Sequence, residues 1–191
     1  DVAARDVCAY ALNARSKALL ESLRVWPDAP SATAVLAMEV RGDAGGTVCF
    51  RADEQGVEAL TWIVDVPALE ARLAEAIRFQ PHVELLAEPC DAALTVVCEG
   101  KASHTREELG VRSEVTPYPQ LAIAGRLRCD RPHKQVARQW FVGGEILAFL
   151  PLDGAQGNSV AFVWSVLKER AADLLAGTDE SLCQELEQIS G

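Results

Sequence analysis

The chain has 191 residues, 18 basic and 28 acidic side chains, and a formal net charge of −10. This length suffices for one or two domains with a hydrophobic core. The content of 49% hydrophobic and 24% charged residues excludes a disordered chain, a collagen-like fibre and a coiled coil. The negative charge leaves nucleic-acid binding without electrostatic support, and the longest apolar runs, 146–152 and 160–163, are too short to cross a bilayer.

Helical and strand patterns are mixed along the first part of the chain. Leucines at helical spacing predict a helix over 7–23, which ends before Pro27. Two β-rich stretches, 34–41 and 47–51, flank the glycine-rich residues 42–46 and predict a hairpin. The remaining predictions here are a strand over 61–64, a helix over 68–78 introduced by Asp65 and Pro67, strands over 83–86 and 94–98, and a short helix over 105–109.

The second part changes to consecutive strands. The predicted strands are 121–128, 136–142, 145–150 and 159–166, with turn residues at 130–132, 143–144 and 153–157. Such spacing predicts an antiparallel meander. Helices follow over 167–176 and 181–189, the second capped around Thr178. The expected fold class is α+β, with a mixed or antiparallel sheet flanked by helices.

Cysteine and histidine give no metal site. The cysteines, at positions 8, 49, 90, 98, 129 and 183, form no CxxC pair and no Cys/His cluster. Cys49 and Cys98 stand in apolar runs, where we expect small buried hydrophobes. The cysteine spacing is not that of a disulfide scaffold. We therefore expect the protein in a reducing cytoplasm. The three histidines lie in polar or turn-like surroundings, where we expect surface or capping roles.

Familiar catalytic motifs are absent from the sequence. It contains no Gly-x-Gly-x-x-Gly, Walker loop, Gly-x-Ser-x-Gly or His-Glu-x-x-His motif. The residues alone therefore assign no catalytic group and indicate only an α+β domain. The chain begins at Asp1 and its single methionine is Met38, so we expect an internal piece of a longer protein.

The most unusual local chemistry lies in residues 94–110, which read LTVVCEGKASHTREELG. An apolar stretch ends at Glu99 and Gly100, and Ser103 is expected to cap a short helix that carries Arg106. Taken alone, this could be an ordinary strand-to-helix turn. It resembles the aromatic-hydroxylase type of flavin monooxygenase (p-hydroxybenzoate-hydroxylase-like), in which a strand runs into Asp-Gly, then Ser-x-x-Arg and a short helix ending in Leu-Gly.

Further segments resemble one branch of that family, the ubiquinone-biosynthesis hydroxylases. They are residues 6–16, 61–64, 118–122, 139–145, 150–152 and 159–164. Their order matches that branch along nearly the whole chain. The resemblance implies a parent enzyme that uses FAD, with NAD(P)H or another reductant, to hydroxylate the aromatic ring of a polyprenylated phenol.

The resemblance also implies which residues touch the cofactor. They are Cys8, Glu99, Gly100, Ser103 and Arg106. Family members commonly carry Arg at the position of Cys8 and Asp at that of Glu99, and a cysteine cannot replace the charge-assisted hydrogen bonds of arginine. Neither the family's N-terminal Gly-x-Gly-x-x-Gly unit nor the Gly-Asp motif that follows its sheet domain is found in these residues. We therefore expect this chain, as a fragment, to be inactive and not to retain FAD.

For the substrate ring, the resemblance and strand alternation suggest six candidates. They are Trp62, Val64, Tyr118, Gln120, Phe149 and Pro151. Simple core packing is the competing interpretation of each. The expected segments are 1–33 (a helical part of the FAD domain), 34–98 (hairpin, strand and helix leading into the sheet), 99–110 (the acid-Gly turn and short helix) and 111–191 (antiparallel sheet and C-terminal helices of the substrate domain).

The remaining expectations concern the partners of the protein and two alternative functions. A prenylated substrate suggests other ubiquinone-biosynthesis proteins as partners and, at most, peripheral contact of a cytoplasmic protein with the inner membrane. The first alternative is a non-catalytic module that binds a hydrophobic ligand or another subunit. The second is a degenerate homologue with structural duties, which Cys8 and Glu99 favour.

Overall fold

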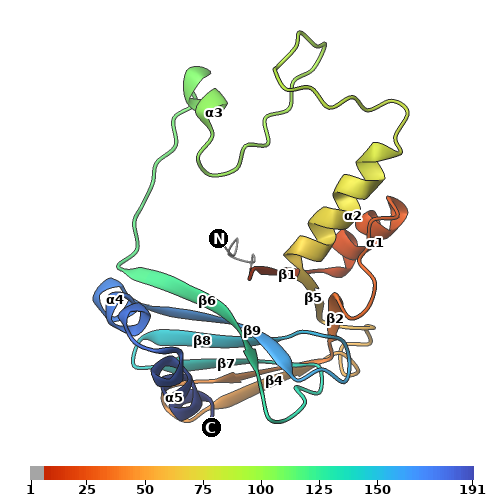
Figure 1. Cartoon of the computed structure of the whole chain (residues 1–191). Coiled ribbons are helices and arrows are strands. Elements are labelled where there is room, and N and C mark those ends of the chain that lie inside the picture. Colours follow the sequence, from red (N-terminus) through yellow and green to blue (C-terminus); the bar gives the residue numbers. More distant parts are fainter. Residues whose placement is uncertain (1–6) are drawn as a thin grey trace. The chain divides into compact units, whose positions relative to one another are not determined.

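The computed structural model describes residues 7–191 and divides the chain into two units (Figure 1). The larger unit combines the chain up to Gln80 with Pro119–Gly191, and the smaller unit is Pro81–Tyr118. Residues 1–6, which include Asp6 of the first family-like segment and the start of the expected segment 1–33, lie outside the described residues. The units do not coincide with the four expected segments, whose assignment to flavin and substrate regions stays a prediction.

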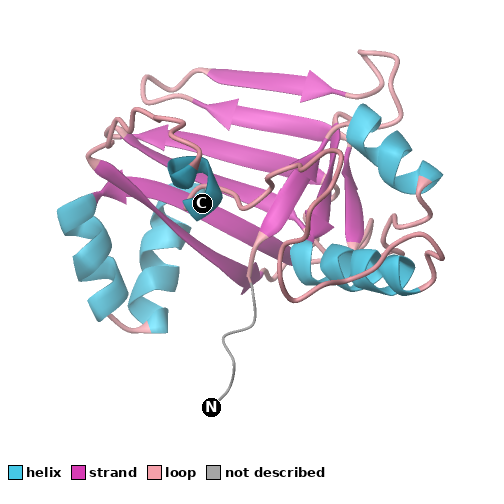
Figure 2. Cartoon of the chain, turned by 90° about the horizontal axis from the view of Figure 1, so that it is seen from above, coloured by secondary structure: helices cyan, strands magenta, loops and turns pink. Residues whose placement is uncertain are grey.

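A six-stranded sheet dominates the larger unit, and its strands lie side by side in Figure 2. Its members are β3 (Ala37–Arg41), β4 (Thr47–Arg51), β6 (Gln120–Arg128), β7 (Val136–Val142), β8 (Glu145–Pro151) and β9 (Ser159–Leu167). The order is β4-β3-β7-β8-β9-β6, and every pair is antiparallel except β3 with β7. The predicted α+β class with a mixed sheet is confirmed.

The predicted four-stranded meander is correct only for β7, β8 and β9. Strand β6 pairs with β9 at the far edge, from Gln120 opposite Leu167 to Arg128 opposite Ser159. Residues 130–132 therefore do not close a hairpin between β6 and β7. The other edge of β7 is taken by β3, in a parallel register that begins with Ala37 opposite Val136. Turn chemistry reports only local neighbours, so it could not reveal this long-range pairing.

A second, three-stranded sheet has the order β1-β5-β2. Its strands are β1 (Ala9–Leu12), β2 (Ala32–Val35) and β5 (Thr61–Asp65), and the adjoining helices are α1 (Ala14–Ser22) and α2 (Val66–Arg78). The helix predicted over 7–23 starts only at Ala14, because residues 9–12 pair with β5 and the Asn13 side chain caps the helix by accepting from the Ser16 N–H at 3.0 Å. The strand predicted over 34–41 is likewise broken at Leu36, so β2 and β3 join different sheets.

Two helices cover one face of the six-stranded sheet. They are α4 (Lys168–Ala176) and α5 (Asp179–Ser190), which Figure 1 shows beside the sheet. Helix α5 begins at the predicted Thr178 cap, which forms a capping box with Ser181. Trp140, Trp164 and Leu147 project from this helix-covered face and pack with Leu186 of α5. On the opposite face, Ala137 and Ala161 pack with Ile63 of the small sheet. Successive side chains along a strand point alternately to these two faces.

The opposite face is covered only in part. The name open face is used here for ten of the positions on this face that lie away from the small sheet: Val40, Val48, Ala122, Ala124, Gln139, Phe141, Ile146, Ala148, Val163 and Ser165. Val48 is 54% exposed, and Phe141 and Val163 are each 37% exposed. The open face therefore presents apolar side chains that the described part of the larger unit leaves uncovered.

The smaller unit contains α3 (His104–Glu108), which confirms the predicted short helix. The strands predicted over 83–86 and 94–98 are wrong: these residues have no regular structure, and Leu85 and Leu94 are each 78% exposed. Apolar residues favour a strand only where a partner strand is present, and no described strand pairs with them. Cys98 in this segment and Cys49 on the edge strand β4 are exposed, so the expectation that they are buried is also wrong.

Candidate functional site

The Glu99 carboxylate lies at the start of α3 and accepts three hydrogen bonds. Its Oε2 accepts from the Ser103 hydroxyl at 2.7 Å and from the Thr105 N–H at 3.1 Å, and its Oε1 accepts from the Thr105 hydroxyl. Donation first by the Thr105 hydroxyl and then by Ser103 lowers the pKa of Glu99, because each bond favours the charged form. The carboxylate is therefore ionised, and its hydrogen bonds turn it toward the start of α3.

Ser103 and Gly100 shape this turn. Ser103 is only 3% exposed and caps α3, since its Oγ accepts from the Arg106 N–H at 3.1 Å; the predicted capping role is confirmed. Gly100 has a φ of +74°, a conformation that L side chains rarely adopt. No atom lies within 4 Å of where a Cβ would stand, so the need for glycine is conformational and the backbone is accessible.

Arg106 is the group in this turn with an unmet hydrogen bond. Its Nη2 donates to the Lys101 carbonyl at 2.9 Å, whereas its buried Nε has no acceptor among the described residues. The surrounding cavity, of about 220 Å³, is lined by Val97, Glu99, Gly100, Ser103, Arg106, Leu109 and Val111. Four of the five predicted cofactor residues thus line one hollow with a free guanidinium donor. Its volume is below the usual 300–1,000 Å³ of a complete ligand site, so it suits one part of a larger ligand.

The fifth predicted cofactor residue, Cys8, belongs to the larger unit. It is exposed just before β1, and its carbonyl accepts from the Arg126 Nη2 at 3.2 Å. Arg126 also donates to the Val7 carbonyl and pairs with Asp65 at 2.6 Å. Cys8 therefore marks a position where β6 holds the chain entering β1, and its role at a cofactor stays a prediction.

The six predicted substrate residues do not line one cavity in the described part of the chain. Trp62 and Val64 are buried together under α1 and α2. Phe149 projects from the helix-covered face, with its ring centroid 5.1 Å from that of Trp140, and Pro151 is fully buried. The remaining two are the exposed Tyr118 and the half-buried Gln120. The Gln120 side-chain amide donates to the Gly144 carbonyl at 2.9 Å. Their contact with a substrate stays a prediction.

Sequence reasoning did not single out the open face. Its residues occupy alternate positions of every strand, as when Val48 lies opposite Val40 and Ala148 opposite Val163. The alternation was visible in the sequence, but both sets of positions are largely apolar, so the pattern alone could not tell which set the helices cover. The pairing register and the placement of α4 and α5 supply that information.

The comparisons with known proteins agree with the resemblance seen in the sequence. No protein-family model matches the chain. The ubiquinone hydroxylase UbiL of Rhodospirillum rubrum is 31% identical over 100 residues, which are 52% of this chain and 23% of that protein. The crystal structure of PqsL of Pseudomonas aeruginosa, a probable FAD-dependent monooxygenase, superposes with a TM-score of 0.71 at 22% identity, over 98% of this chain and 58% of that chain. The chain shares the fold of the corresponding part of PqsL.

The predicted resemblance to aromatic-hydroxylase flavoproteins is thereby confirmed. PqsL in complex with 2-aminobenzoylacetate gives a similar likeness, with a TM-score of 0.72 at 21% identity over 98% of this chain and 58% of that one. The chain thus spans little more than half of these solved monooxygenases, and its match to UbiL covers about a quarter of that protein. Among the described residues, no helix combines the length and the apolar character needed to traverse a bilayer.

Proposed function

We propose that this sequence belongs to an FAD-dependent monooxygenase that hydroxylates the aromatic ring of a polyprenylated phenol in ubiquinone biosynthesis. The observation that carries this proposal is the turn from Glu99 to Arg106, with its open glycine backbone and its free arginine donor, in a chain with a monooxygenase fold. The partial match to a ubiquinone hydroxylase supports the choice of substrate class.

The residues of the turn fit a polar edge of FAD. Gly100 lets the backbone approach a ligand, and the unpaired Arg106 Nε can donate to a ligand oxygen. Ser103 and Glu99 hold this arrangement in place through their own hydrogen bonds. When bound, FAD would take electrons from a reductant such as NAD(P)H and supply the oxygen-transfer chemistry.

The open face suits the prenyl part of the substrate. The ten positions that define it include no charged side chain, and several of them are exposed. A polyprenyl chain placed along this face would remove apolar area from water on both partners, at about 25 cal/mol per Å². Exclusion of water is also what hydroxylation of an electron-rich ring requires.

The test uses the whole natural protein that carries this sequence, supplied with FAD, NAD(P)H and a prenylated phenol. We expect a product with one added oxygen, detected by mass spectrometry. Arg106→Gln should weaken FAD binding about 10-fold, since it removes a charge-assisted donor. Arg112→Gln, in the same unit and without an ion pair among the described residues, is the matched control and should leave FAD binding within about 2-fold.

A hydrophobic-ligand or subunit-binding module is the second candidate, and the exposed open face favours it. The same experiment separates the two functions. If the prenylated phenol binds and FAD with reductant yields no hydroxylated product, the monooxygenase proposal is wrong and the binding module takes its place.

A further inference from the structure

A cavity lies on the other side of the sheet from the open face. It has a volume of about 710 Å³ and is formed by Val136, Arg138 and Trp140 of β7, Phe149 of β8 and Leu186 of α5, with the loop after β6. This volume is within the range of small-molecule sites. No residue of the Glu99–Arg106 turn lines it, so it is a separate feature from the proposed cofactor contact.

Basic side chains gather around this cavity. Five of the chain's 18 basic residues line it: Arg41, Arg128, Arg131, Lys134 and Arg138. Arg138 pairs with Glu39 at 3.0 Å. The other four have no ion-pair partner within residues 7–191. In a chain with a net charge of −10, basic side chains that outnumber the acidic ones around one cavity attract an anion to it.

The charge around the cavity can be compared with that of a ligand. Two acidic residues, Asp130 and Glu187, line it, and Glu39 neutralises Arg138. The side chains therefore leave an excess of two positive charges. A phosphate monoester carries a charge of about −1.5 to −2 near pH 7. Two of its oxygens can accept a bidentate pair of hydrogen bonds from one guanidinium group.

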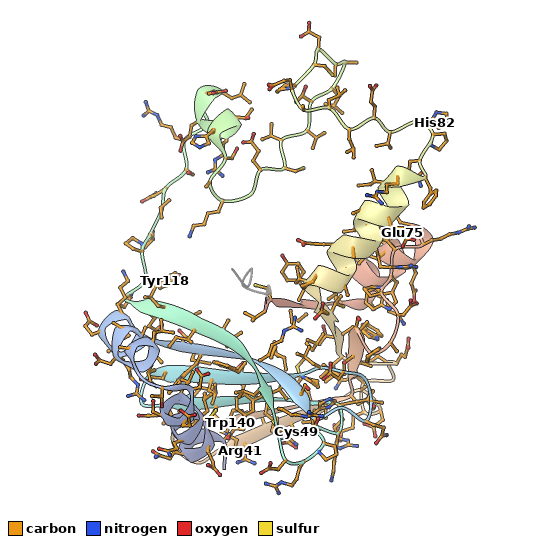
Figure 3. The ribbon with its side chains drawn as sticks, viewed as in Figure 1. Arg41, Cys49, Glu75, His82, Tyr118 and Trp140 are labelled. Carbon is orange, nitrogen blue, oxygen red and sulfur yellow. The ribbon has the colours of Figure 1, made fainter. Side chains whose placement is uncertain are left out.

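The floor of the cavity is aromatic. Trp140 is 4% exposed, and its ring meets that of Phe149 edge to face. Figure 3 shows Arg41 beside Trp140, as their opposite positions in β3 and β7 require. The Trp140 Nε1 is buried without an acceptor among the described residues, which is an unfavourable state for a donor. An occupant with an apolar body and an anionic head would match both floor and rim.

We propose that this cavity binds a small organic phosphate monoester. Its phosphate lies among the basic side chains that line the cavity, and its apolar part lies over Trp140 and Phe149. The inference depends on the charges, the volume and the rings alone, so it is independent of the monooxygenase proposal.

Isothermal titration calorimetry on the 191-residue chain at low ionic strength tests this binding. The probe is 1-naphthyl phosphate, compared with neutral 1-naphthol, with 1-naphthoate and with inorganic phosphate. We expect one equivalent of 1-naphthyl phosphate to bind at least 10-fold more tightly than each of the other three. Failure to bind it at millimolar concentration would overturn the proposal. Equal affinity for the naphthoate or for naphthol would overturn the choice of phosphate, and equal affinity for inorganic phosphate would overturn the aromatic floor.

Paired arginine variants locate the site. The double variant Arg41→Gln/Arg128→Gln changes two exposed side chains at the rim and should weaken binding at least 10-fold. The double variant Arg15→Gln/Arg78→Gln removes the same charge from exposed positions that do not line the cavity, and should change affinity less than 2-fold. Thermal unfolding of both variants reports folding. Equal losses in the two variants would show general charge attraction and overturn the assignment to this cavity.

Discussion

At the scale of single residues, Gly125 shows how closely the paired strands β6 and β9 pack within the sheet. A Cβ at this position of β6 would lie 2.5 Å from Cε1 of Phe162, a core side chain that is only 4% exposed. We predict that Gly125→Ala lowers the free energy of unfolding by about 1 to 3 kcal/mol, through overpacking. Urea denaturation followed by tryptophan fluorescence measures the change.

Gly46→Ala provides the control, because nothing lies within 4 Å of its Cβ position and its φ is not positive. This variant should stay within about 0.5 kcal/mol of the parent chain. Equal stability of the two variants would contradict the packing argument.

Glu99 gives a pH-dependent prediction at the same scale. Hydrogen bonds from Thr105 and Ser103 lower its pKa below the unfolded value, so their stabilisation of the turn is complete above the ordinary pKa of glutamate and is lost as the pH falls through the lowered one. An NMR titration of the Glu99 carboxyl carbon should have its midpoint below the usual glutamate range. Ser103→Ala should move the midpoint back toward that range, and an unmoved midpoint would show that Ser103 has no part in it.

Residue-scale reasoning from the sequence succeeded where the chemistry is local. The caps at Ser103, Asp65 and Thr178 were predictable, because a cap acts within three residues of its own position. The free Arg106 Nε was not, since a missing partner is visible only in three dimensions.

At the scale of elements, Arg126 joins the two sheets of the larger unit. It pairs from β6 with Asp65 at the end of β5, at 2.6 Å, and donates to the carbonyls of Val7 and Cys8 before β1. We predict that Arg126→Gln costs about 1 to 2 kcal/mol of unfolding free energy, because hydrogen bonds from a charged donor are lost in a partly buried place.

A double-mutant cycle with Asp65→Asn isolates the pair. Asparagine can still cap α2 through the Ala68 N–H but carries no charge. Chemical denaturation of both single variants and the double variant should give a coupling energy of about 1 kcal/mol. Strictly additive effects would show that the ion pair does not connect the sheets.

The boundaries of elements were predictable in proportion to their local signals. Helix α2 and the hairpin of β3 and β4 were found because an N-cap with proline and a glycine-rich turn define them. Residues 9–12 were assigned to a helix because their pairing with β5 bridges some 50 residues of sequence. The candidate substrate residue Phe149 lies in a strand that was predicted correctly. Which face of the sheet α5 covers depends on packing, so alternation alone could not show that Phe149 lies on the helix-covered face.

At the scale of the whole molecule, the 191 residues include one short turn that fits part of FAD and no glycine-rich dinucleotide motif. We predict that the purified chain is colourless, with no stoichiometric flavin in its visible absorbance spectrum, and that it does not oxidise NAD(P)H. Reconstitution with excess FAD followed by gel filtration measures retention. A yellow protein with one flavin per chain would contradict this prediction and would mean that the described contacts suffice for cofactor binding.

The fold class was predictable at this scale because composition and the order of the elements report it. The strand order was not, since β3 meets β7 and β6 meets β9 through contacts that no neighbouring residues announce. The two faces of the sheet, and with them both the open face and the basic cavity, follow from that order.

The parallel pairing of β3 with β7 also has a consequence for biosynthesis. Glu39 and Arg138 form an ion pair across 99 residues of chain, and the whole smaller unit is synthesised between them. On the ribosome, β3 and β4 therefore emerge long before β7, with one edge of β3 unpaired. An unpaired edge is a template for intermolecular association, and non-local pairing slows folding. The nascent chain thus passes through a stage in which this hairpin exposes an edge to which other chains can pair.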